Sequence, residues 1–442
     1  MGRKKIYQKD LGYDILKPII DCTVKNSYRR ISVKGVDNIP DDGAVILAPN
    51  HCNTLMDALV VLRADRRAKV FGARADMFNI KLVAKIMYFL RILPMVRLRD
   101  GLRNVLKNKD TEEIIIETLE HKVPFCIFPE GQHQAKHSAQ PLSKGIFRIA
   151  MQAQELMPDM PLYIVPVGLQ YGNFFRFRST INVKIGDPIN VGEFLADNSE
   201  YTPQEQMNKM RNVLAEKMRS LILYIPNDDN YDAVYEICAA SMRPQRKKLL
   251  NSLPKGSIHP KLAQFEANNI TNSTVTRLLE KEPEKGAELI RLGNEASRMR
   301  VSQKISLSSI TSKFPLWVRF FRFLLFLITL PYCIPASILI LPINLLCSQA
   351  FRLLKDYAFR NSVRFMANLI VWPLLLIIYT SLAYIFLPWE WALVCSLLFI
   401  PAPVAAQEMW RLFRLEISDI KLLLDKKLRN TYKQIQEIIL NS

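Results

Sequence analysis

The fold is decided at residues 44–57, which read AVILAPNHCNTLMD. The first five residues are apolar and have the length of a short buried strand. His51 follows at the carboxyl end of this strand, where the pattern predicts the start of a helix. Open α/β sheets place their ligands at this edge. The stretch therefore predicts an α/β protein with a site that begins at His51.

The same kind of strand recurs along the first 190 residues. Each run is rich in Val, Ile or Phe and is bounded by Gly, Pro or Asp. The predicted strands are Ile31–Lys34, Ala44–Ala48, Lys69–Gly72, Pro124–Phe128, Leu162–Val167 and Ile181–Ile185. Helical patterns separate them at Phe78–Arg91, Asp110–His121 and Ser143–Leu156. This alternation predicts a mixed sheet with flanking helices.

His51 and Asp57 are the residues that we expect to carry the chemistry. A histidine can take a proton from an alcohol near neutral pH. A carboxylate one to two helical turns further on can bond its other ring nitrogen and fix the tautomer. We expect His51 to be the base and Asp57 its partner, although a His and an Asp six positions apart also occur by chance.

Three further blocks carry candidate binding residues. Glu130 and Gly131 follow an apolar strand, where the glutamate can accept a hydrogen bond from a substrate hydroxyl or an arginine. Pro-Glu-Gly is also a common turn sequence. Arg97 follows a short apolar stretch, and its guanidinium suits bidentate binding of phosphate. Pro166 and Val167 lie in a buried strand that ends in a bend, which predicts a pocket wall.

The order of the blocks resembles the phospholipid and glycerol acyltransferase family. That family includes lysophosphatidic acid and glycerol-3-phosphate acyltransferases. Its Asn-His…Asp, arginine, Pro-Glu-Gly and Val-Pro-Val blocks correspond here to Asn50/His51/Asp57, Arg97, Phe128–Gly131 and Val165–Val167. The stretches Gly35–Pro40 and Pro141–Gly145 are also similar, and the resemblance covers roughly residues 30–190.

The resemblance implies direct acyl transfer on a glycerolipid acyltransferase-like fold. His51 would deprotonate a glycerol hydroxyl, which attacks the thioester of acyl-CoA or acyl-carrier protein. Arg97, Glu130, Gly131 and Asn50 would bind the acceptor, and neither a cofactor nor a metal is implied. We expect 1-acyl-sn-glycerol 3-phosphate as the acceptor in phospholipid biosynthesis, with sn-1 acylation of glycerol 3-phosphate as the alternative.

Two departures from the family pattern bear on the acceptor. Five residues separate His51 from Asp57, whereas four are common in the family, and some glycerol-3-phosphate-type members are similar in this respect. Gln132 and His133 replace the usual Thr-Arg or Thr-Ser after Gly131. For His133 and nearby His137, a solvated loop is as good an interpretation as a binding role. Cys52 lies beside His51 and could form an acyl thioester with the enzyme. The resemblance already gives His51 a role that needs no such intermediate.

The carboxyl-terminal part of the chain predicts a membrane region at residues 316–412. Charged residues are absent from Phe323–Phe351, Phe365–Trp389 and Trp391–Gln407. A helix needs roughly 20 apolar residues to cross the hydrocarbon of a bilayer. Three prolines and the cations that follow predict a re-entrant or interfacial segment at 323–351. A transmembrane hairpin is expected at 365–410, with its turn near Pro388.

The remaining parts complete the predicted organisation. We expect a basic amphipathic helix at residues 1–30 and the acyltransferase domain at 31–190. A helical connector is expected at 191–315 and a basic cytoplasmic helix at 413–442. The chain carries a net charge of +19, which favours anionic headgroups of a bilayer. It has no nucleic-acid-binding signature. The positive-inside tendency places the catalytic domain on the cytoplasmic face. The alternative to an enzyme is a non-enzymatic scaffold that binds membrane lipids.

Overall fold

The computed structural model describes residues 5–65, 67–95, 108–254, 260–312, 315–354 and 356–442. It divides into two compact units. The first comprises residues 1–222 and 343–375, and the second comprises residues 223–342 and 376–442. The predicted boundary after residue 190 therefore differs from the division after Ile222.

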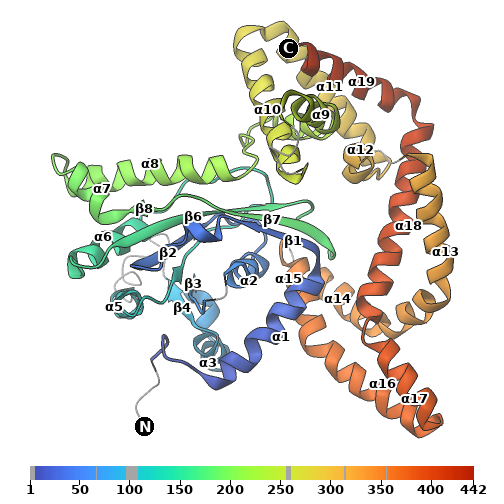
Figure 1. Cartoon of the computed structure of the whole chain (residues 1–442), viewed down its shortest axis with the longest axis horizontal. Coiled ribbons are helices and arrows are strands. Elements are labelled where there is room, and N and C mark those ends of the chain that lie inside the picture. Colours follow the sequence, from blue (N-terminus) through green and yellow to red (C-terminus); the bar gives the residue numbers. More distant parts are fainter. Residues whose placement is uncertain (1–4, 66, 96–107, 255–259, 313–314, 355) are drawn as a thin grey trace. The chain divides into compact units, whose positions relative to one another are not determined.

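The first unit contains one eight-stranded mixed sheet (Figure 1). Its strand order is β1-β7-β6-β2-β5-β3-β4, and β8 pairs with β6. All pairs are parallel except those of β6 with β7 and with β8. The predicted fold class is confirmed. The strands are β1 Tyr28–Lys34, β2 Ala44–Pro49, β3 Val70–Arg74, β4 Ile92–Met95, β5 Phe125–Cys126, β6 Leu162–Tyr171, β7 Ser179–Ile185 and β8 Ile189–Asn190.

Helices cover both faces of this sheet because β2 is apolar at every position. Ile46 points into a core that includes residues of α5, α6 and α8, whereas Val45 and Leu47 point into a core with residues of α1, α2 and α15. The sheet is therefore buried on both sides. The helices of this unit are α1 Leu11–Ser27, η1 Val36–Asn38, α2 Leu55–Ala64, η2 Ala75–Phe78, α3 Lys81–Phe89, α5 Asn108–Glu120, α6 Gly145–Leu156, α7 Val191–Asp197, α8 Pro203–Leu221, α14 Leu341–Leu353 (from Ile343), α15 Phe359–Met366 and η4 Ala367–Val371.

Two strands and one helix differ from the sequence-based expectation. β4 contains Pro94, which cannot donate to a sheet, and it lies at the edge of the sheet where this is tolerated. β8 has only two residues and leaves little pattern to find. The helix predicted over Phe78–Arg91 is split into η2 and α3.

The amino-terminal helix α1 buries Ile20 and Val24 on the sheet and leaves Ile15 and Ile19 exposed.

The second unit is helical. A core of its own joins α9, α10, α11, α12 and α19. This core shows that residues 223–312, expected as a connector, form part of a packed body together with the last helix of the chain. Its helices are α9 Tyr231–Ser252, α10 Pro260–Lys281, α11 Pro283–Ser302, α12 Leu307–Ser312, α13 Leu316–Leu339, α16 Trp372–Phe386 (from Leu376), α17 Trp389–Phe399, α18 Ala402–Leu424 and α19 Lys426–Asn441.

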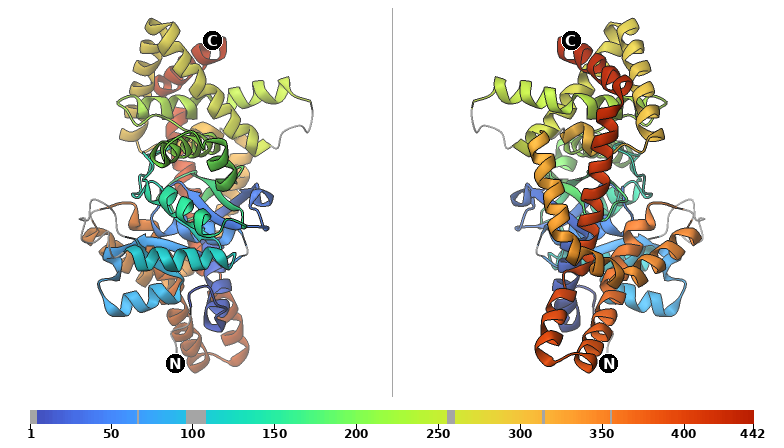
Figure 2. Two further views of the ribbon diagram at one scale, coloured as in Figure 1. Left: turned by 90° about the vertical axis from the view of Figure 1, so that its left-hand side faces the viewer. Right: turned by 90° about the vertical axis from the view of Figure 1, so that its right-hand side faces the viewer.

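Apolar helices occupy the region where a membrane segment was predicted. Among the described residues, Leu316–Leu339 and Phe359–Phe386 are long and apolar enough to cross a bilayer. The pair α17 and α18, bent by 55°, gives a third candidate if it counts as one span. Figure 2 shows α13 and α18 side by side within the second unit. α13 stays helical through Pro331 and Pro335, so a single crossing is an alternative to the re-entrant segment predicted there.

Candidate active site

The turn between β2 and α2 brings His51 and Asp57 together. Nδ1 of His51 lies 2.7 Å from Oδ2 of Asp57. Asp57 sits in the first turn of α2 and is completely buried, whereas the His51 side chain keeps part of its surface exposed. The pair has the arrangement of a general base and the carboxylate that orients it.

Three more hydrogen bonds hold the Asp57 carboxylate. Oδ2 also accepts from the backbone N–H groups of Cys52 and Asn53, at 2.7 and 2.6 Å. Oδ1 accepts from the hydroxyl of Tyr171, at 2.5 Å. Because both oxygens are occupied, the carboxylate is fixed in the orientation that His51 requires.

The turn between His51 and Asp57 contains a strained residue, Thr54. This residue has φ of +44°, which is a costly backbone conformation for a β-branched side chain. The same turn directs the N–H groups of Cys52 and Asn53 at the Asp57 carboxylate. Its hydroxyl bonds the Ser362 hydroxyl at 2.8 Å.

Glu130 lies directly behind His51. Its carboxylate accepts from the backbone N–H of His51 at 3.2 Å and from that of Gln140 at 3.3 Å. Burial raises the pKa of Glu130 to about 7, and the two N–H donors oppose that rise. Gly131 follows with φ of +65°, which glycine adopts without strain. The Phe128 ring stacks on the His51 ring, with centroids 4.3 Å apart.

The first and fourth sequence blocks are adjacent in the sheet. Val167 pairs with Pro49 in the parallel β2–β6 ladder, and its carbonyl accepts from the Asn50 N–H at 3.2 Å. The buried Asn50 side-chain amide donates to the carbonyl oxygen of Leu169 and accepts from the Leu169 N–H. Pro166 and Val167 are buried in β6. Substrate contact by Asn50 and a wall formed by the Val-Pro-Val block remain predictions, and both blocks hold the His51 turn in place.

The two histidines after Gly131 have different environments. His137 is buried beside the ring of Phe174, and burial lowers its pKa to about 4, so a solvated loop does not describe it. Nε2 of His133 lies 2.7 Å from Oδ2 of Asp356. The centroid of its ring lies 5.6 Å from that of His51. Cys52 is buried, and burial followed by the charge of Asp57 raises its thiol pKa well above the usual range.

Tyr171 and Asp356 are not among the residues predicted from the sequence. Tyr171 ends β6, which also contains Tyr163 and Gln170, so its polar end does not distinguish it in the sequence. Asp356 lies between two apolar runs, more than 200 residues from His133, and no local pattern links the two. Arg97 lies outside the described residues. Among the residues that are described, no group of three or more His, Cys, Asp or Glu side chains could hold a metal ion.

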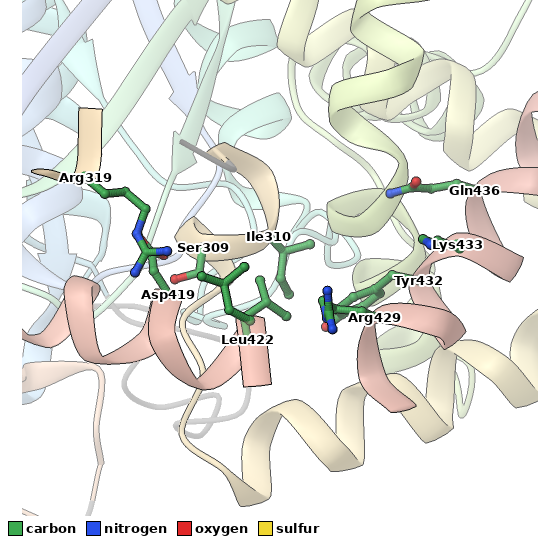
Figure 3. Close-up of a pocket in the computed structure, with 10 residues that line it drawn as sticks. Ser309, Ile310, Arg319, Asp419, Leu422, Arg429, Tyr432, Lys433 and Gln436 are labelled. Atoms are coloured by element: carbon green, nitrogen blue, oxygen red, sulfur yellow. The ribbon is translucent and has the colours of Figure 1, made fainter. Parts of the chain in front are cut away.

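A pocket in the second unit is separate from these motifs. Figure 3 shows side chains of α12, α13, α18 and α19 around it, including Arg319, Asp419, Arg429 and Tyr432. Arg319 is bonded to Glu416, which compensates its charge. The described residues of the four sequence blocks all belong to the first unit.

Curated proteins with similar sequences include acyltransferases of yeasts. The chain is 26% identical over 243 residues to glycerol-3-phosphate O-acyltransferase 2 of Saccharomyces cerevisiae, covering 55% of this chain and 32% of that protein. It is 35% identical over 77 residues to glycerol-3-phosphate O-acyltransferase 1 of the same yeast, which is 17% of this chain and 10% of that protein. The chain thus matches about a third or less of the length of these relatives.

A solved structure and a family description also match. The crystal structure of the 1-acyl-sn-glycerophosphate (LPA) acyltransferase PlsC from Thermotoga maritima aligns with 20% identity and a TM-score of 0.34, over 48% of this chain and 82% of that one. Residues 30–170 match the model of the Acyltransferase family. This range holds the His51–Asp57 pair, Glu130 and the Val-Pro-Val block. Residues 30–170 are therefore similar to the Acyltransferase family, and the chain is similar to glycerol-3-phosphate O-acyltransferases over part of their length.

Proposed function

We propose that the protein transfers a fatty acyl group from a thioester donor to a hydroxyl of glycerol 3-phosphate. The observation that carries the proposal is the 2.7 Å contact between His51 and the fully bonded carboxylate of Asp57. It lies at the carboxyl end of β2, in the family's domain.

The geometry supports a general-base role for His51. Nδ1 donates to Asp57, which leaves the lone pair of Nε2 for the acceptor hydroxyl. The oxygen of that hydroxyl then attacks the thioester carbonyl, and the imidazolium returns the proton to the departing thiolate. Base assistance of this kind is worth about 10²–10⁴-fold in rate. The N–H groups of His51, Cys52 and Asn53 are bonded to carboxylates, so the oxyanion must be stabilised by other donors.

Two observations favour glycerol 3-phosphate over 1-acyl-sn-glycerol 3-phosphate. The two yeast relatives named above are glycerol-3-phosphate O-acyltransferases. The spacing of five residues between His51 and Asp57 is also the one that some glycerol-3-phosphate-type members have. Lysophosphatidate, the acceptor expected from the sequence, is the second candidate. Arg97 is proposed to bind the acceptor phosphate, and acyl-CoA or acyl-carrier protein to be the donor.

We propose further that the protein works on a membrane, with the catalytic domain on the cytoplasmic face. The two apolar helices Leu316–Leu339 and Phe359–Phe386 support insertion. The cations Arg352, Arg360 and Arg364 between the apolar runs support the orientation.

The test is acyl transfer by the purified full chain in detergent. Labelled acyl-CoA and acyl-carrier protein are offered with each acceptor separately, to the wild type, His51→Ala and Asp57→Asn. Product from glycerol 3-phosphate that falls at least about 10²-fold in His51→Ala supports the proposal. Product from lysophosphatidate alone would transfer the proposal to that acceptor. A His51→Ala variant with full activity, or a wild type inactive on both acceptors, would contradict it and favour the lipid-binding scaffold.

A further inference from the structure

A short segment between two apolar stretches lies against the catalytic turn. It runs from Asp356 to Ser362 and enters α15, whose first four residues it includes. The segment belongs to the same compact unit as His51, and α15 contacts α2 directly (Figure 1). About 300 residues separate it in sequence from the turn that it contacts.

The first contact is made at the strained residue of the catalytic turn. The Thr54 hydroxyl bonds the Ser362 hydroxyl at 2.8 Å and lies 3.3 Å from the carbonyl oxygen of Ala358. Thr54 has a positive φ, and such a conformation persists only where surrounding contacts enforce it. Ser362 and Ala358 are both buried, so water does not replace these bonds.

The second contact shares an acceptor with the same turn. The side-chain amides of Asn53 and Asn361 both donate to the carbonyl oxygen of Phe174. Asn53 also gives its backbone N–H to the Asp57 carboxylate. Asn361 therefore fixes, through Phe174, the loop that holds one of the donors to the catalytic carboxylate.

The third contact holds a ring that lies next to His51. Asp356 holds Nε2 of His133 at 2.7 Å, and the Phe359 ring meets the edge of the His133 ring with centroids 5.8 Å apart. Within the part of the chain that the structure describes, no hydrogen bond is formed by Nδ1 of His133. The His133 ring is thereby fixed at 5.6 Å from that of His51.

We propose that Asp356–Ser362 is a positioning element of the acyltransferase site. Ser362 and Asn361 hold the His51–Asp57 turn in its reactive geometry, and Asp356 orients His133 on the acceptor side. The inference rests on the proposed function. It adds that the catalytic geometry depends on a segment that includes the first four residues of the apolar helix Phe359–Phe386.

The test separates the two halves of this element by steady-state kinetics on the full chain. Ser362→Ala is expected to lower kcat about five- to tenfold with the acceptor KM little changed, because only the base's turn is loosened. Asp356→Asn is expected to raise the acceptor KM by about fivefold or more, because His133 loses the carboxylate that holds its Nε2 atom. Ser362→Thr and Asp356→Glu restore the hydroxyl and the carboxylate, and should recover most of each loss.

Asp76→Asn is the matched control. Asp76 pairs with a cation, Arg74, at a comparably exposed position of the same unit, and it takes no part in the site described above. This variant should keep wild-type kinetics. If Ser362→Ala and Asp356→Asn also keep wild-type kcat and KM, the segment has no positioning role.

A readout that does not require activity tests the docking itself. In the variant His133→Cys/Asp356→Cys, a short bismaleimide should link the two introduced thiols, and the link is identified by mass spectrometry of peptides. His133→Cys/Asp356→Ser is its control. Absence of the link overturns the inference even in an active enzyme. A link in this variant, together with a wild type that acylates neither acceptor, would overturn the proposed function and the positioning role, while leaving the docked segment established.

Discussion

The Tyr171 hydroxyl donates a 2.5 Å hydrogen bond to Oδ1 of Asp57, the oxygen opposite the one that contacts His51. Tyr171 ends the strand that also carries the Val-Pro-Val block, and burial raises its pKa well above the usual range. The hydroxyl therefore remains a donor at all physiological pH values. It completes the set of four bonds that hold the carboxylate.

Tyr171→Phe should lower kcat about tenfold, because removal of one bond to a buried carboxylate costs on the order of 1.5–3 kcal/mol. The acceptor KM should change little, since Tyr171 has no expected contact with substrate. Tyr163→Phe is the control, because Tyr163 lies on the same strand and bonds Asp42 at the surface. An equal loss of kcat in both variants would attribute the effect to the strand and not to Asp57.

Cys52→Ser should keep kcat within about threefold of the wild type, because a thiol that remains protonated is a poor nucleophile. Burial and the Asp57 charge raise the Cys52 pKa, and the side-chain amide of Asn50 donates to its sulfur at 3.1 Å. The direct measurement is the mass of the protein quenched after exposure to acyl-CoA without acceptor. An acyl adduct on Cys52 would establish a thioester mechanism instead.

The strands and the His51 site could be predicted because their signals are local. An apolar run of five residues comes shortly before His51, and Asp57 follows within two helical turns. The predicted base and its carboxylate partner therefore lie in one short stretch of sequence. β4 was missed because Pro94 and its short length look like a loop. An edge strand tolerates both features, and only the assembled sheet reveals that Ile92–Met95 lies at an edge.

The partners of the site could not be predicted because their signals are not local. Asp356 meets His133 only through tertiary packing, and a carboxylate between two apolar runs is ordinarily a solvated loop residue. For His137, a solvated loop was one of two interpretations, and its burial could not be predicted. A histidine in a polar stretch is expected in solvent, whereas the ring of Phe174 and the fold of the loop bury it.

His137 should make the protein less stable in acid. Burial lowers its pKa from an ordinary 6.5 to about 4, so the unfolded chain binds a proton in this interval and the folded chain does not. The resulting stability is present above pH 6.5 and is lost as the pH falls toward 4. It is worth at most about 3 kcal/mol, since one pKa unit corresponds to about 1.4 kcal/mol.

His137→Gln should accordingly flatten the fall in melting temperature between pH 6.5 and 4, measured by thermal unfolding at several pH values. His121→Gln replaces an exposed histidine of the same unit and serves as the control. If the two variants show the same pH dependence as the wild type, burial of His137 does not govern acid stability.

Glu236 should be a main determinant of stability in the second unit. Its buried carboxylate accepts from Nε of Arg300 on both oxygens, at 2.9 and 2.8 Å, and from the Tyr432 hydroxyl at 2.6 Å. These bonds tie α9 to α11 and α19. Loss of the carboxylate leaves a largely buried guanidinium unpaired, which costs roughly 3–5 kcal/mol.

Glu236→Ala should therefore unfold at lower denaturant and expose residues 223–312 to limited proteolysis. The contacts of His51 lie wholly in the first unit, so kcat per folded molecule should stay near the wild-type value. Glu288→Gln removes an exposed pair with Arg291 in the same unit and should change stability little, because exposed ion pairs contribute little. A Glu236→Ala protein that lost transfer while remaining folded would show that the helical unit acts on the reaction itself. Such a result would mean that its packed helices do more than stabilise their own core.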